Sequence, residues 1–200
     1  MKFRHAALAL AALALPLVAC GDDKEAKVLS GYQLTPPPTV GALSLPDASN
    51  GDSDFTFVSQ PDRYLVVYFG YTYCPDVCPT TLAEVKKAFK QLGDQAEQVD
   101  VAMITVDPNR DTGDILTNYV QSFIPGAHAL RTDDADQLDA VGKAFGASFT
   151  VTENAAGEVE VSHSGNLYVV DQNGDVVLQW PFGLKADAIA TDLEILFEKA

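Results

Sequence analysis

Two continuous apolar runs dominate the pattern of hydrophobic and polar positions along the chain. Residues 64–69 read Tyr-Leu-Val-Val-Tyr-Phe, and residues 99–106 read Val-Asp-Val-Ala-Met-Ile-Thr-Val. Both runs are rich in residues that favour strands, and neither shows the sustained alternation of a strand with one solvated face. We therefore predict two central strands, each buried on both faces.

A helical pattern follows each of these strands. Apolar residues recur three or four positions apart between residues 82 and 92, and Pro79 precedes them, where proline suits the first helical turn. A second helical stretch ends at Phe123. The order strand, helix, strand, helix predicts a parallel βαβ unit.

The C-terminal part of the chain supplies a hairpin and two more helices. Residues 134–145 and residues 189–197 have amphipathic helical patterns, and Asn173-Gly174 separates the apolar runs 166–170 and 175–180. This order predicts an α/β thioredoxin-like fold, in which a central mixed sheet is flanked by helices. In that fold the reactive cysteine loop follows the first strand of the βαβ unit.

The N-terminus has the pattern of an export signal. Lys2 and Arg4 precede a short apolar run that closes on Leu17-Val18-Ala19-Cys20. The run is shorter than the roughly 20 apolar residues of a membrane-spanning helix. Its end resembles the bacterial lipobox, which implies a lipoprotein signal peptide over residues 1–19 and lipidation of Cys20. The alternative is an ordinary signal peptide with an incidental cysteine.

The remaining residues divide into a tether and one domain. Residues 20–38 are polar and then proline-rich, which predicts a lipidated N-terminus followed by a flexible tether. Residues 39–200 are sufficient for a single domain, and 47% of the residues in the whole chain are apolar. We expect this domain on the periplasmic side of a bacterial membrane, held there by the lipid anchor.

The charge excludes one class of partner. Removing residues 1–19 leaves 11 basic against 28 acidic residues, a formal charge of −17. A protein that binds nucleic acid needs a basic face to displace counterions from phosphate, so no nucleic-acid partner is expected. The negative field could steer a basic docking partner, or it could serve solubility alone.

The two remaining cysteines, Cys74 and Cys78, lie at the predicted strand-to-helix junction. A helix N-terminus favours thiolate over thiol, and thiolate is both the nucleophile and the metal ligand. Three intervening residues let both sulfurs converge on one ion, although they do not forbid a disulfide. Soft thiolates prefer Cu(I), zinc or iron–sulfur clusters, and an added imidazole suits copper or zinc.

Two histidines follow the expected signal peptide. His128 precedes a predicted helix, where a surface or capping role is the simpler interpretation. His163 lies in the loop before the C-terminal hairpin, which in a thioredoxin-like fold faces the cysteine helix. Structural zinc usually takes four protein ligands, and here there are three unless Asp76 joins them. This favours one copper ion per domain, as Cu(I) or Cu(II).

Three segments carry a resemblance to a known family. Residues 69–82 read Phe-Gly-Tyr-Thr-Tyr-Cys-Pro-Asp-Val-Cys-Pro-Thr-Thr-Leu, residues 106–112 read Val-Asp-Pro-Asn-Arg-Asp-Thr, and His163-Ser164 follows later. Together they resemble the SCO (SenC/PrrC) family, in order from about residue 41 to the C-terminus.

The resemblance implies the copper ligands Cys74, Cys78 and His163. It also implies copper delivery and thiol redox work in assembling the binuclear CuA centre of cytochrome c oxidase, with the CuA-bearing subunit or another copper protein as partner. Two departures stand out: residues 48–62 are a weak version of the family's opening hairpin, and Val161-Ser162 precedes the histidine where an acidic residue is common.

Several functions remain open at this point. Cys74 and Cys78 could instead be the redox-active pair of a thiol-disulfide oxidoreductase that reduces the cysteines of the copper-accepting partner. A purely structural disulfide fits their position poorly, and a peroxidase-like enzyme would need a positive pocket, whereas no Arg or Lys adjoins Cys74 in the sequence. Asp107, Arg110 and Asp111 are interpreted as a helix-entry network outside the site.

Overall fold

The two apolar runs form the centre of a sheet. In the computed structural model, which describes residues 28–199, β3 (Tyr64–Gly70) pairs in parallel with β4 (Val99–Thr105). All seven residues of β3 are buried. This confirms the prediction that both runs are central strands, and it places the residue after β3 at the start of the cysteine loop.

The complete sheet is mixed, as predicted for a thioredoxin-like fold. Its seven strands have the order β2-β1-β5-β4-β3-β8-β9. β3, β4 and β5 run in parallel, and the other pairs are antiparallel. The remaining strands are β1 (Ser44–Asp47), β2 (Ser53–Thr56), β5 (His128–Leu130), β8 (Leu167–Val170) and β9 (Val176–Trp180). The opening hairpin β1–β2 thus begins before the 48–62 segment in which it was expected.

The predicted turn between β8 and β9 is confirmed. Gly174 has a φ of 76°, a conformation that favours glycine. A Cβ at this position would also come within 2.4 Å of the Gly41 backbone. The glycine therefore closes the hairpin and admits the N-terminal segment beside it.

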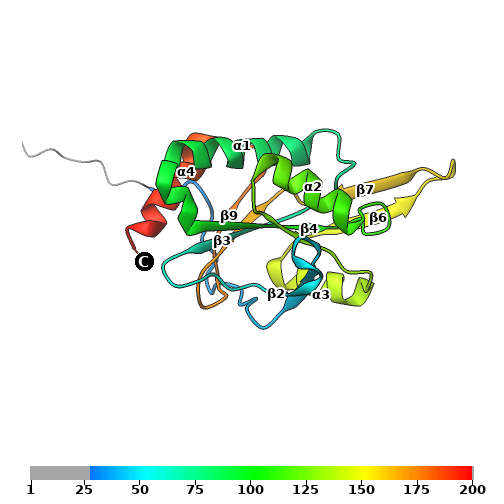
Figure 1. Ribbon diagram of the computed structural model, residues 1–200, viewed down its shortest axis with the longest axis horizontal. Coiled ribbons are helices and arrows are strands. Elements are labelled where there is room, and N and C mark those ends of the chain that lie inside the picture. Colours follow the sequence, from blue (N-terminus) through cyan, green and yellow to red (C-terminus); the bar gives the residue numbers. More distant parts are fainter. Residues whose placement is uncertain (1–27, 200) are drawn as a thin grey trace, which may run out of the picture.

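Helices cover both faces of the sheet. Figure 1 shows α1 (Val77–Leu92), α2 (Gly113–Phe123) and α4 (Ala186–Phe197) on one side, and α3 (Ala135–Phe145) on the other. Short 3₁₀ turns lie at Ala48–Asn50 and Gly93–Gln98. Among residues 28–199, no helix combines the length and the apolar composition needed to cross a bilayer.

The start of α1 differs slightly from the prediction. The helix begins at Val77, two residues before Pro79, and Asp76 occupies the N-cap position. Cys78 therefore lies inside the first helical turn and Cys74 lies in the loop before it. Both cysteines remain at the predicted strand-to-helix junction.

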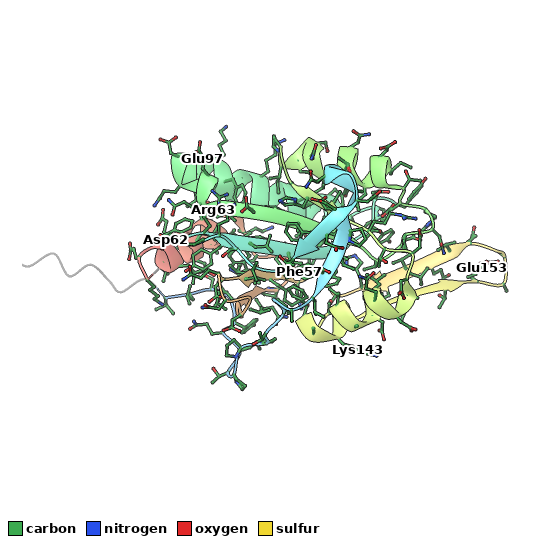
Figure 2. The ribbon with its side chains drawn as sticks, turned by 60° about the horizontal axis from the view of Figure 1, so that its bottom comes forward. Phe57, Asp62, Arg63, Glu97, Lys143 and Glu153 are labelled. Atoms are coloured by element: carbon green, nitrogen blue, oxygen red, sulfur yellow. The ribbon has the colours of Figure 1, made fainter. Side chains whose placement is uncertain are left out.

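A second hairpin was not predicted. β6 (Phe149–Glu153) pairs with β7 (Val159–His163) in a separate two-stranded sheet, with Phe149 opposite His163. Figure 2 shows Glu153 near the far end of this hairpin, which extends from the body of the molecule. His163 consequently ends a strand and does not lie in a loop.

Part of the expected tether is attached to the domain. The buried carboxylate of Asp192 in α4 accepts hydrogen bonds from the backbone N–H groups of Ser30 and Gly31, at 2.7 and 2.9 Å, and from the indole of Trp180. Tyr32 then bridges to Gln179 of β9. Residues 30–32 of the 20–38 segment are therefore bound to the fold. The expected signal peptide and Cys20 lie outside the described residues.

Candidate metal centre

The cysteine loop brings Cys74 to the N-terminus of α1. A turn closes where the N–H of Cys74 donates to the Tyr71 carbonyl oxygen, at 3.3 Å. The backbone N–H of Cys78 then donates to the Sγ of Cys74, also at 3.3 Å. The sulfur of Cys74 thus faces the positive end of the helix, as predicted.

His163 reaches this pair of sulfurs from the end of β7. Its Nε2 lies 3.5 Å from the Sγ of Cys78. Its Nδ1 lies 3.1 Å from the carbonyl oxygen of Ser164, so the tautomer that donates there leaves the Nε2 lone pair directed at the sulfur. This backbone oxygen orients the imidazole. The prediction that His163 reaches the sulfurs is confirmed.

The three atoms are spaced for one metal ion. The sulfurs of Cys74 and Cys78 and a ring nitrogen of His163 all lie within 4.8 Å of one another. Bonds of about 2.0–2.3 Å to one ion would hold trigonal ligands about 4 Å apart, so small adjustments suffice. Asp76 is exposed and accepts a hydrogen bond from Thr80, and it is not part of the cluster.

Burial determines the protonation of Cys78 in the metal-free protein. Desolvation raises the pKa of this fully buried thiol to about 12, against the opposing interactions with Tyr68 and with the backbone at Tyr71. The expected thiolate is therefore not found at Cys78 before metal binds. Burial also lowers the pKa of His163, which keeps the imidazole neutral and able to bind a metal.

Aromatic rings and a glycine surround the ligands. The ring of Tyr71 lies edge-on to that of His163, with centroids 5.7 Å apart. At Gly70 an added Cβ would lie 2.7 Å from the Tyr68 ring and 3.0 Å from the Sγ of Cys78. The bare backbone at this position therefore leaves room for the buried sulfur.

Asp111 ties the cysteine loop to β4. Its buried carboxylate accepts the backbone N–H of Thr72 at 3.0 Å and the hydroxyl of Thr105 at 2.6 Å. The sequence interpretation placed Asp111 in a helix-entry network, and no local pattern pointed to its contact with residue 72. It acts on the site by holding the loop that carries Cys74.

Arg110 brings a cation close to the same loop. The ion pair with Asp107 confirms the expected Arg–carboxylate contact. The guanidinium also lies over the ring of Tyr73, 5.0 Å from its centroid, and 5.9 Å from that of Tyr71. Sequence reasoning missed this approach, because Arg110 is remote from the cysteines along the chain.

The other described histidine lies outside the cluster. The Nδ1 of His128 is 2.7 Å from a carboxylate oxygen of Asp47, and the residue begins β5. Its partner is therefore this buried aspartate and not a helix end.

Comparisons with known proteins agree with this arrangement. A family model described as SCO1/SenC matches residues 48–198. A protein of Stutzerimonas stutzeri that is named for copper binding is 34% identical over 170 residues, which cover 84% of this chain and 83% of the relative.

Two solved structures show the same fold. The solution structure of apo Sco1 from Thermus thermophilus has a TM-score of 0.72 at 28% identity, covering 86% of this chain and 99% of that one. The structure of Bradyrhizobium japonicum ScoI with copper bound has a TM-score of 0.65 at 28% identity, covering 76% of this chain and 96% of that one.

Proposed function

The chain belongs to the SCO1/SenC family, and we propose that it is a metallochaperone that delivers copper to the CuA centre during assembly of cytochrome c oxidase. Cys74, Cys78 and His163 hold one copper ion. The convergence of two sulfurs and one imidazole nitrogen within 4.8 Å carries this proposal. Two soft thiolates and an imidazole suit copper, and three protein ligands fall short of the four that structural zinc usually takes.

Release of the ion proceeds by ligand exchange. Cys74 is the more accessible of the two cysteines, since its exposed fraction is 9% against 0% for Cys78. A partner thiolate therefore adds to copper on the Cys74 side, and the bond from copper to the Cys74 sulfur breaks as the new bond forms. Exposed Tyr73 in the cysteine loop offers an apolar contact for the partner at this entrance.

The lipobox pattern supports a location at the membrane. Lipid on Cys20 holds the domain on the periplasmic side of a bacterial membrane, where a copper-accepting membrane protein is within range. The test is fractionation of a Cys20→Ser variant, which we expect in the soluble fraction. A variant that stays with the membranes would argue against the lipid anchor.

A thiol-disulfide oxidoreductase is the second candidate, favoured by the hydrogen bond from the N–H of Cys78 to the Cys74 sulfur. The Cys74 thiolate attacks a partner disulfide and releases one partner thiolate. Cys78 then attacks the Cys74 sulfur, forms the Cys74–Cys78 disulfide and frees the second partner thiol, so that two electrons pass to the partner. The two activities are compatible, because cysteines must be reduced before they accept copper.

Metal content after loading with Cu(I) distinguishes the two candidates. The reduced protein should hold close to one copper and little zinc, and His163→Ala should lose tight copper binding. His128→Asn is the matched control, because it replaces the other described histidine and keeps an N–H donor for Asp47. Equal, weak copper binding in the wild type and in His163→Ala would reject the chaperone and leave the oxidoreductase.

A further inference from the structure

A buried tyrosine hydroxyl without a partner lies beside the metal centre. Tyr68 of β3 is 0% exposed, and its Oη has no hydrogen-bond partner among the described residues. Buried hydroxyls are normally hydrogen-bonded, because losing water without replacement costs free energy. An unpaired hydroxyl at this position therefore calls for a partner that forms in another state of the protein.

The Cys78 sulfur borders the same space as the Tyr68 ring. A Cβ added at Gly70 would lie 2.7 Å from the Cε1 of Tyr68 and 3.0 Å from the Sγ of Cys78, so both groups border the same small space. The Tyr68 ring also lies 6.1 Å from the His163 ring. Tyr68 thus faces the ligand cluster from inside the core.

A neutral thiol and a thiolate offer this hydroxyl different partners. The sulfur of a thiol is a weak acceptor, and a hydrogen bond to an ionised acceptor is much stronger. Copper binding converts the thiol of Cys78 into a metal-bound thiolate. The hydroxyl of Tyr68 then gains the acceptor that it lacks in the metal-free protein.

We propose that Tyr68 is a positioning residue for copper, whose hydroxyl donates a hydrogen bond to the Sγ of Cys78 when that sulfur is a thiolate. The bond favours the copper-loaded dithiolate over the Cys74–Cys78 disulfide, in which the sulfur is again a weak acceptor. This inference rests on the proposed function. Tyr68 would thus adjust the metal–sulfur bond without being a ligand itself.

The test compares two Tyr→Phe variants in the full chain. Tyr68→Phe removes only the hydroxyl. Tyr168→Phe is the matched control, because Tyr168 is also 0% exposed in a central strand with an unpaired Oη, but its hydroxyl faces Ser164 and Asn166. Neither change leaves a large cavity, and both variants should keep the thermal stability of the metal-free protein.

Three measurements follow for each protein. Tyr68→Phe should still bind one copper, but its Cu(I) affinity in competition with a chelator should fall about tenfold, the lower end for a hydrogen bond to a charged group. The thiolate-to-Cu(II) charge-transfer band should move to lower energy, because the sulfur donates more charge without the hydrogen bond. In the metal-free protein at equilibrium with a dithiol, which gives two electrons and two protons to the disulfide, the disulfide fraction should stay near that of the wild type, because Cys78 is then a neutral thiol. Tyr168→Phe should match the wild type.

The outcomes separate this inference from the proposed function. A Tyr68→Phe protein with wild-type copper affinity and band position overturns the role of Tyr68, as does an equal change in Tyr168→Phe. A wild-type chain that binds no copper overturns the chaperone and with it the copper-positioning role of Tyr68, so the wild-type protein distinguishes the two failures.

Discussion

A methyl group added at Gly70 should disturb the metal centre from the side of the buried core. In a Gly70→Ala variant the new Cβ would lie 2.7 Å from the Cε1 of Tyr68, 3.0 Å from the Sγ of Cys78 and 3.1 Å from the Cε of Met103. Each of these three side chains is 0% exposed, so none can move into solvent. At least one of them must shift by several tenths of an ångström to restore ordinary contact.

The expected cost has two parts. Overpacking of a buried site costs about 1–3 kcal/mol. For a domain of this size, that lowers the melting temperature by about 2–12 °C. If the sulfur moves, its distance from the Nε2 of His163, now 3.5 Å, also changes. Disturbance of this kind at a ligand typically lowers metal affinity about 10- to 100-fold.

Thermal unfolding of the metal-free protein and Cu(I) competition measure the two parts separately. Gly113→Ala is the control, because its Cβ would lie 2.9 Å from the Cβ of Ala48 and far from the sulfurs along the chain. A Gly70→Ala protein with wild-type stability and affinity would refute the reasoning. Lower stability with unchanged affinity would show that Tyr68 or Met103 gives way while Cys78 stays in place.

Three further predictions concern charge and hydrogen bonding. Asp111→Asn replaces the carboxylate that accepts from Thr72 and Thr105 with an amide. The free energy of unfolding measured in urea should fall by about 1–3 kcal/mol, and Cu(I) binding should weaken. An unchanged unfolding midpoint would contradict this prediction. Asp192→Asn should lower the free energy of unfolding by about 2–4 kcal/mol, because three N–H donors face the buried carboxylate. Limited proteolysis should then cut near Ser30. Wild-type resistance to the protease would argue against the attachment of this segment by Asp192. Burial raises the pKa of the Cys78 thiol to about 12, so Cu(I) must displace its proton at neutral pH. The apparent Cu(I) affinity should therefore rise at least tenfold per pH unit from about pH 7 to 9. A Cu(I) affinity that does not change with pH would refute this prediction.

Local sequence patterns predicted the strands with continuous apolar runs and the turn with a glycine signal. The runs 64–69 and 99–106 appear as β3 and β4, and Asn173-Gly174 forms the turn of the C-terminal hairpin. The sequence also led to the cluster of Cys74, Cys78 and His163, because the inferred thioredoxin-like fold and the family resemblance both brought the histidine to the two cysteines.

The missed features depend on contacts between distant segments. β6 and β7 are largely exposed. Their short sequences, Phe-Thr-Val-Thr-Glu and Val-Glu-Val-Ser-His, do alternate apolar and polar residues, but this alternation was not interpreted as a hairpin. The pKa of Cys78 depends on how completely the fold excludes water, which spacing alone does not reveal. Asp192 captures Ser30 from 162 residues away, so the tether seemed longer in the sequence than it is in the fold.

With the proposed lipid anchor, the hydrogen bonds of Asp192 to Ser30 and Gly31 would limit how far the domain can travel from the membrane. With the proposed lipid on Cys20, only ten residues separate the anchor from Ser30, a contour of at most about 35 Å, whereas a free chain to position 39 would extend about 65 Å. The described chain begins at the end of the molecule opposite the β6–β7 hairpin (Figure 1), and the ligand cluster lies at the far end of the 16-residue α1, about 24 Å long. The tether would thus set an upper limit on the distance of the copper site from the bilayer. A short tether of this kind raises the effective concentration of the copper site for acceptors within its reach and excludes acceptors beyond it.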